Sequence, residues 1–146
     1  KKKSIYTKYY KPPEVLLKLG YTEKSDIWAT ACTIYELLTG DILFDIDQVN
    51  SQRKLYHLKL IYEITGTIPN YMIDNCLKKE QYFTNDYFLK SVTKLKINFW
   101  RNLLNNKNFI NNKKIFDLID LLLKMLDTNP NTRISASDAL KHKLFS

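Results

Sequence analysis

One stretch, SDIWATACTIYELLTG at residues 25–40, strongly limits what this chain can fold into. Its apolar and aromatic residues recur at helical spacing on nearly every side of one helix: Ile27, Trp28, Ala29, Ala31, Cys32, Ile34, Tyr35 and Leu38. Such a helix belongs at the centre of a domain, and we expect it to pack against a helix over 114–126 and against the last helix. Ser25 is suited to cap its first turn, and Gly40 is suited to end it in the left-handed conformation.

Asp26 places a carboxylate in the first turn of this helix, where the helix dipole favours a negative charge. A carboxylate at the start of a buried helix has to be paired or hydrogen-bonded to backbone amides, because an unpaired buried charge is very costly. Asp26 is therefore either a plain N-terminal cap or a group that binds another segment, and the helix alone leaves both interpretations open.

The composition limits the class of protein. The 146 residues are 45% hydrophobic, which is enough for one core, and no apolar run is long enough to cross a membrane. Cys32 lies within the central helix and Cys76 stands alone far from it, which indicates neither a disulfide framework nor a metal site. We therefore expect one domain, or a large piece of one, in a reducing compartment inside the cell, without a metal or a membrane partner.

The net charge of +8 raises the question of nucleic-acid binding. The basic residues are 20 Lys and only 3 Arg, spread among 13 Asn, and a bias toward Lys and Asn on solvated faces explains them as well. Because aromatic and basic residues do not interleave, we expect no direct nucleic-acid contact. An acidic surface is predicted beside the central helix, since residues 25–52 hold five acidic and no basic residues: Asp26, Glu36, Asp41, Asp45 and Asp47.

The residues before the central helix are predicted to form a loop and one short helical turn. Pro12 and Pro13 fix their own φ and push the preceding residue toward extended geometry, so residues 1–14 cannot form one continuous helix. The apolar residues over 15–19 then predict a helical turn that Gly20 closes.

After the central helix, the pattern predicts further helices and no strand signal that rivals them. An acidic loop over 40–50 leads to an amphipathic helix over 53–65, and residues 114–126 carry a clear stripe of 3.6-residue period. The region between these two helices looks like an insertion on a core, with short helical pieces such as 71–79 and 99–104.

The last helix is predicted to begin at Ser135, with Asp138 three residues later as its capping-box partner. Pro130 separates it from the helix before. Its inner face is expected to consist of Ala136, Ala139, Leu140 and Leu144.

Three stretches match a known pattern in order and in spacing. TKYYKPPE at residues 7–14 resembles the end of a protein-kinase activation segment, with Pro-Pro-Glu at 12–14 in the place of the A-P-E tripeptide. DIW at residues 26–28 resembles the start of the long central helix of the kinase C-terminal lobe. RISA at 133–136 resembles the end of the kinase domain, together with the later residues Leu140, His142 and Phe145.

Among protein kinases, the chain is most similar to the Ser/Arg-rich-protein (SR-protein) kinases of the CMGC group. The similar segments are GYTEKSDIWATACTIYELLTGDILFD at 20–45, HLKLIYEITGTIP at 57–69 and TKLK at 93–96. The resemblance implies that residues 1–146 form a partial protein kinase domain with an all-α fold. That fold would contain the end of the activation segment, the central buried helix, a CMGC-type insert over about 71–112 and two closing helices.

The resemblance also implies structural roles for single residues. Glu14 and Arg133 match a buried ion pair that ties the activation segment to the loop before the last helix. Asp26 matches a carboxylate that accepts backbone amides of the catalytic loop, and Trp28 belongs to the same motif. Thr7 matches the threonine that contacts the catalytic aspartate and helps to position a Ser/Thr substrate, although without the motif it would be a plain loop hydroxyl.

Lys8, Tyr10 and Lys11 complete the segment that is expected to position the substrate. Lys8 and Lys11 stand where arginines are usual, and a lysine ammonium cannot reproduce the bidentate fork of a guanidinium. Pro12 stands where a small residue is usual.

Two further residues match the groove in which SR-protein kinases dock Arg-rich substrates. Glu63 matches one of its two acidic residues and Lys107 matches its lysine, but Tyr56 stands at the other acidic place. Glu63 could also be a solvated helix residue that pairs with Lys59, four positions earlier.

The sequence contains no Gly-rich loop, no V-A-I-K lysine, no H-R-D and no D-F-G motif, so no catalytic residue is expected in this chain. ATP and Mg²⁺ are expected to bind a part of the kinase that precedes Lys1, and this chain is expected to be inactive alone. The implied partners are the kinase N-terminal lobe with its catalytic loop and an Arg/Ser-rich protein substrate, whose serine would receive the γ-phosphate of ATP.

Two other functions stay open at this point. The chain could be a non-catalytic remnant of a kinase lobe that docks other proteins, or a basic helical domain that binds nucleic acid. H-R-D and D-F-G motifs in the sequence before Lys1 would decide in favour of the kinase.

Overall fold

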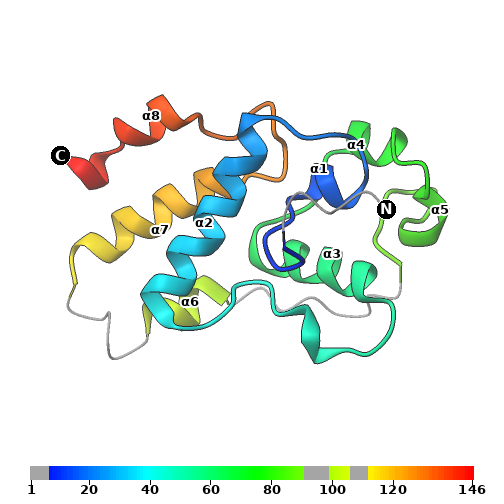
Figure 1. Ribbon diagram of the computed structural model, residues 1–146, viewed down its shortest axis with the longest axis horizontal. Coiled ribbons are helices and arrows are strands. Elements are labelled where there is room, and N and C mark those ends of the chain that lie inside the picture. Colours follow the sequence, from blue (N-terminus) through cyan, green and yellow to red (C-terminus); the bar gives the residue numbers. More distant parts are fainter. Residues whose placement is uncertain (1–6, 91–98, 106–111) are drawn as a thin grey trace.

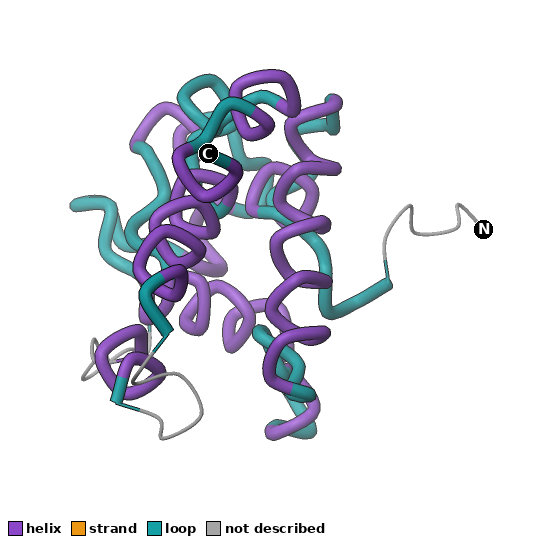
Figure 2. The backbone as a smooth tube through the Cα atoms, turned by 90° about the vertical axis from the view of Figure 1, so that its left-hand side faces the viewer, coloured by secondary structure: helices purple, strands orange, loops and turns teal. Residues whose placement is uncertain are grey.

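A computed structural model describes residues 7–90, 99–105 and 112–146 of the chain. In these ranges the regular structure is helical, and the extended backbone pairs only at one isolated antiparallel bridge between Phe83 and Leu89. Figures 1 and 2 show the helices from two sides. The all-α class predicted from the sequence is confirmed.

The helices follow one another along the chain. They are α1 (Pro13–Leu16), α2 (Glu23–Thr39), α3 (Arg53–Ile64), α4 (Asn70–Asp74), α5 (Lys79–Tyr82), α6 (Phe99–Leu104), α7 (Lys114–Met125) and α8 (Ala136–Leu140). Two 3₁₀ helices, η1 (Ile46–Gln48) and η2 (Lys143–Phe145), complete the set. Figure 1 shows α2 in the middle, with α7 and α8 toward one end of the molecule and α1, α3, α4 and α5 toward the other.

The central helix α2 begins two residues before the predicted start. Thr22, not Ser25, is its N-cap, and the Thr22 side chain accepts a hydrogen bond from the Lys24 backbone amide at 3.1 Å. Ser25 completes the capping box, because its hydroxyl accepts from the Thr22 backbone amide at 3.1 Å. Gly40 ends the helix with φ 77°, the left-handed conformation that the sequence predicted.

One side of α2 enters the core. Trp28 is completely buried and its ring stacks on Phe44, with centroids 5.5 Å apart and planes 11° apart. α7 packs along α2, as predicted, and contributes buried side chains such as Leu122 and Met125. The predicted contact between α2 and the last helix stays a prediction.

The opposite side of α2 faces solvent, so the expectation of a helix buried nearly all round is wrong. Asp26, Thr30, Thr33 and Leu37 are exposed, and Leu37 has 83% of its surface free. These residues are spaced by three or four positions and therefore form one stripe along the helix. The predicted buried charge at Asp26 is wrong for the same reason, since its side chain lies on this stripe.

The other predicted helices are present with small shifts. α3, α6 and α7 agree with the predicted ranges within one residue, whereas the predicted piece over 71–79 divides into α4 and α5. α1 starts at Pro13, two residues earlier than predicted, because the fixed φ of proline suits the first helical position. The boundaries of the insert at about 71–112 stay a prediction.

The last helix has a smaller inner face than predicted. Ser135 caps α8 and accepts from the Asp138 backbone amide at 3.2 Å. α8 is only five residues long, so Leu144 lies beyond it on η2, which packs on α7. Ala136 and Leu140 are exposed, with 73% of the Leu140 surface free, which contradicts their predicted inward orientation.

Candidate functional site

The best-defined polar site joins α1 to the loop before α8. Glu14 in α1 and Arg133 lie 119 positions apart in the sequence. The Arg133 NH1 and NH2 groups donate to Glu14 Oε2 and Oε1 at 2.8 and 2.9 Å, which makes a bidentate pair. Both side chains are almost completely removed from solvent. The ion pair expected between these two residues is present.

Further hydrogen bonds surround the pair. Arg133 also donates through Nε to the Asp127 carbonyl at 2.8 Å and through NH1 to the Lys24 carbonyl at 2.7 Å. The buried Ser25 hydroxyl donates to Glu14 Oε2 at 2.8 Å. Such extensive hydrogen bonding is what makes a buried charge pair tolerable. The site therefore ties α1, the start of α2 and the end of the α7 region to one another.

Trp28 packs against the same pair. The Arg133 guanidinium lies over the Trp28 ring, 5.2 Å from its centroid, in a cation–π arrangement. The planar guanidinium is suited to stack and to form the bidentate pair at once, which a lysine could not do. Trp28 thus belongs to this site as well as to the core.

The segment over 7–11 is held on the surface beside this site. Thr7 and Lys8 are exposed, whereas Tyr10 and Lys11 are half-buried. The Tyr10 backbone amide donates to the Thr7 carbonyl at 3.0 Å, which closes a turn. The Tyr10 hydroxyl donates to Glu36 Oε1 on α2 at 2.6 Å. This bond raises the pKa of Tyr10 to about 12, because it stabilises the protonated hydroxyl beside a carboxylate.

Asp47 in the acidic loop is the second anchor of the segment. Lys8 Nζ lies 2.7 Å from Asp47 Oδ1, and the Tyr9 hydroxyl donates to Asp47 Oδ2. Arg53 NH1 lies 3.8 Å from the same carboxylate. The hydrogen bond from Lys8 and then that from Tyr9 lower the pKa of Asp47, so the carboxylate stays ionised.

Asp47 and Glu36 were not predicted as site residues from the sequence. The only signal was the acidic window over 25–52, which predicted an acidic surface but not its partners. In the structure these two carboxylates bind Lys8, Tyr9 and Tyr10 of the chain itself. Part of the acidic surface is therefore neutralised internally.

A family model described as the protein kinase domain matches residues 1–145. The chain belongs to the protein kinase family. The buried Glu14–Arg133 pair and the segment before it are therefore parts of a kinase C-terminal lobe, and the predicted fold class is confirmed.

Curated relatives agree with this assignment. Serine/threonine-protein kinase SKY1 of Saccharomyces cerevisiae is 35% identical over 142 residues, which cover 95% of this chain and 19% of the relative. A putative serine/threonine-protein kinase of Acanthamoeba polyphaga mimivirus is 35% identical over 141 residues, 94% of this chain and 26% of the relative. Dual specificity protein kinase lkh1 of Schizosaccharomyces pombe is 30% identical over 149 residues, 97% of this chain and 21% of the relative.

These relatives support the resemblance to the SR-protein kinases stated from the sequence. The kinase chain described here spans between about a fifth and a quarter of the length of the curated relatives that it matches.

The residues expected to dock substrate lie apart from the ion pair. Glu63 is half-buried in α3, one helical turn beyond Lys59. Tyr56 stands where the resemblance would put an acidic residue. Lys59 Nζ lies 5.8 Å from the centroid of the Tyr56 ring. Lys107 and the TKLK segment at 93–96 lie outside the described residues.

Protein kinases generally use ATP and Mg²⁺. None of the described His, Cys, Asp and Glu side chains form a group of three or more that could hold a metal ion. The sequence also lacks the nucleotide-binding motifs of the family. Among the described residues, therefore, no group of side chains fits ATP with its metal.

Among the described helices, none combines the length and the apolar character that a membrane span requires.

Proposed function

We propose that this chain is the C-terminal lobe of a serine/threonine kinase similar to the SR-protein kinases. Together with a part that carries the ATP site, it would transfer the γ-phosphate of ATP to serines in Arg/Ser-rich proteins. In this proposal the lobe positions the substrate and the other part supplies ATP, Mg²⁺ and the catalytic loop. The proposed location is the cytoplasm and nucleus.

The observation that carries the proposal is the buried Glu14–Arg133 pair with the segment before it. The pair ties α1 to the loop before α8, while Asp47 binds Lys8 and Glu36 binds Tyr10. Thr7 remains exposed at the start of the segment, where its hydroxyl is accessible to a catalytic loop. Positioning, together with electrostatic stabilisation, is what a protein contributes to phosphoryl transfer.

The exposed stripe of α2 is consistent with the same proposal. Leu37 is a large apolar side chain with 83% of its surface free, and Asp26 lies on the same stripe at the N-terminal end of the helix. We assign this stripe to contact with the catalytic loop and the rest of the kinase. A non-catalytic lobe that docks other proteins is the alternative.

The first functional prediction tests the proposed division of roles between this chain and the ATP-binding part. The purified 146-residue chain is expected to show no ATP-dependent phosphorylation of an Arg/Ser-repeat peptide, because it has no nucleotide-binding motif. The measurement is transfer of labelled phosphate from ATP to the peptide, with an active serine kinase assayed in parallel. Phosphate transfer by the chain alone would contradict the division of roles proposed here.

The second functional prediction concerns Glu63. In the kinase assembled with its ATP-binding part, Glu63→Lys is expected to weaken binding of an Arg/Ser-repeat peptide by about tenfold at low salt, equal to about 1.4 kcal/mol. The reason is that a carboxylate holds a guanidinium through charge-assisted hydrogen bonds, which a lysine would replace with repulsion. The measurement is peptide affinity by fluorescence anisotropy at several salt concentrations.

Two controls accompany this measurement. Asp86→Lys reverses an exposed carboxylate outside α3 and is expected to change the affinity less than twofold. Tyr56→Glu restores an acid at the second docking place and is expected to tighten binding. The difference between Glu63→Lys and wild type should shrink as salt rises, because surface charges are screened. Equal affinities at low salt would remove the docking role of Glu63.

A further inference from the structure

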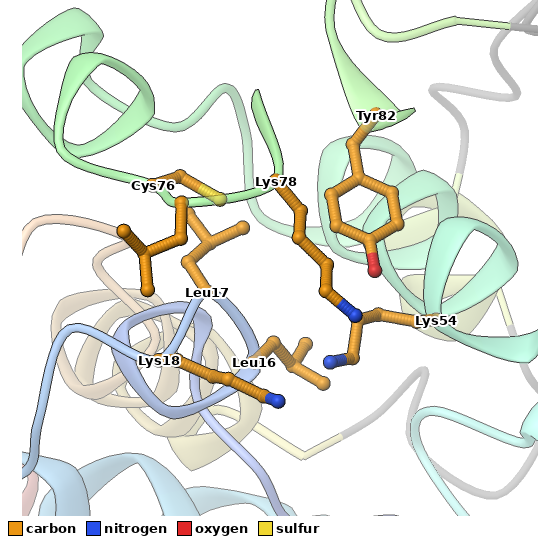
Figure 3. A pocket seen from close by; sticks show the side chains of 8 residues that line it. Leu16, Leu17, Lys18, Lys54, Cys76, Lys78 and Tyr82 are labelled. Atoms are coloured by element: carbon orange, nitrogen blue, oxygen red, sulfur yellow. The ribbon is translucent and has the colours of Figure 1, made fainter. Parts of the chain in front are cut away.

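Three adjoining pockets lie along the N-terminal half of α3. The first lies between α1, α3 and the segment before α5, and its walls include the apolar side chains of Leu16, Leu17, Cys76 and Leu77 (Figure 3). The second pocket shares Lys54 and Tyr82 with the first. The third shares Gln52, Leu55 and Lys90 with the second. We call this continuous depression the α3 groove.

The α3 groove is lined by basic side chains and by no acidic one among the described residues. The basic residues come from the turn after α1, from α3 and from the two segments that flank α5: Lys18, Arg53, Lys54, Lys59, Lys78 and Lys90. The chain as a whole has 15 acidic residues beside 23 basic ones, so a surface free of carboxylates is a local property. A groove of this kind attracts anions and repels the Arg-rich class of peptide.

Three of these lysines gather around the first pocket. Figure 3 shows the side chains of Lys18, Lys54 and Lys78 extending over the pocket from three different segments. Among the described residues, no carboxylate lies within salt-bridge distance of these lysines, whereas Arg53 is close to Asp47 at 3.8 Å. Burial, followed by the charges of Lys18 and Lys78, lowers the pKa of Lys54. An anion in the pocket would relieve this repulsion.

The backbone at Lys18 brings one of these lysines to the pocket. Lys18 follows α1 with φ 58°, the left-handed conformation that glycine usually adopts after a helix. Its amide donates to the Val15 carbonyl at 3.1 Å, and the Leu19 amide donates to the Glu14 carbonyl at 2.8 Å. Glycine would satisfy the same turn at lower backbone cost, so the stability of the turn does not explain the lysine.

We propose that the α3 groove binds an extended acidic peptide, whose most negative part lies against Lys18, Lys54 and Lys78. The three joined pockets favour an extended chain over one small anion, which would fill only the first pocket, of about 70 Å³. The apolar walls of that pocket suit the aliphatic parts of glutamate side chains. A peptide fits better than a nucleic acid, because the basic residues are five lysines and one arginine without a row of exposed aromatic rings for base stacking. This binding does not depend on the proposed phosphoryl transfer, although the third pocket shares Tyr56 with the proposed docking place for Arg-rich substrate.

The test measures binding of a fluorescent glutamate-rich decapeptide to the full 146-residue chain by anisotropy at low salt. The double variant Lys54→Glu/Lys78→Glu is expected to lose at least tenfold in affinity. A matched control, Lys113→Glu/Lys141→Glu, makes the same change in net charge at two exposed lysines outside the groove and should stay within twofold of wild type. Circular dichroism of every variant reports whether the helices are intact.

Lys18→Gly keeps the proposal testable if the double variant fails to fold. Glycine suits φ 58°, so this variant should fold at least as well as wild type and still bind the peptide about threefold more weakly. Equal losses in the groove variant and its matched control would overturn the proposal, because binding would then follow net charge alone. Wild-type affinity in Lys18→Gly would overturn it too. So would a single-stranded RNA of equal charge that binds tenfold more tightly and displaces the peptide.

Discussion

Replacing Arg133 with methionine is expected to destabilise the chain by about 3–5 kcal/mol, enough to unfold a small domain. The substitution leaves Glu14 buried without its bidentate partner, and it removes the bonds to the Asp127 and Lys24 carbonyls. It also removes the cation that stacks on Trp28. The measurement is the free energy of unfolding by urea, followed by circular dichroism.

The chain offers a matched control for this prediction. Lys124→Met breaks an exposed pair in which Lys124 Nζ lies 3.0 Å from Asp120, and it should cost less than about 1 kcal/mol. Glu14→Gln should fall between the two, because the amide oxygen still accepts from Arg133 while the charge is lost. A loss of less than about 1 kcal/mol in Arg133→Met would contradict a structural role for the pair. It would also remove the support that the pair gives to the placement of residues 7–11.

The second large effect is a loss of folding stability as the pH is lowered. His57 is buried in α3 beside Phe44, and burial, followed by the charge of Lys11, lowers its pKa from 6.5 to about 4. The unfolded chain therefore binds a proton at His57 below pH 6.5, whereas the folded chain does so only near pH 4. Stability from this residue is present above pH 6.5 and is lost as the pH falls toward 4. The full loss is about 3 kcal/mol.

The comparison of wild type with His57→Phe isolates this contribution. Phenylalanine cannot be protonated, and its ring can keep the contact with Phe44, which lies 5.7 Å from His57 between centroids. Carboxylates that titrate in the same pH range change the free energy of unfolding of both proteins equally. Urea unfolding between about pH 7 and 4 should show the free energy of unfolding of wild type falling relative to that of His57→Phe, by up to about 3 kcal/mol, because only wild type loses the histidine contribution. Parallel curves would show that His57 is not held neutral by the fold.

Local patterns determined most of the helices. The 3.6-residue period specified α3 and α7 within one residue, because a helix buries one face and repeats apolar residues accordingly. Gly40 was predictable as a helix end, since the left-handed conformation is a property of that residue and its turn. The pairing of Glu14 with Arg133 was predicted from the resemblance to protein kinases. No local propensity could have predicted a contact across 119 positions.

Tertiary structure decided what local patterns could not. The N-cap of α2 is Thr22 and not Ser25, because the Ser25 hydroxyl both closes the capping box and binds the buried Glu14 carboxylate. The exposed stripe of α2 could not be predicted from the number of apolar residues on the helix. A hydrophobic residue such as Leu37 can face solvent, so its type alone does not show which side of the helix is buried.

The partners of the charged residues were also decided by the tertiary structure. The acidic window over 25–52 predicted an acidic surface, but only the folded chain shows that Lys8 and Tyr9 meet Asp47. Likewise, Lys18, Lys54 and Lys78 are far apart in the sequence, and the packing of α1 beside α3 brings them to one pocket. On α3 and α7 the sequence period determined which face is buried, whereas charges on exposed faces acquire partners only when separate segments are packed together.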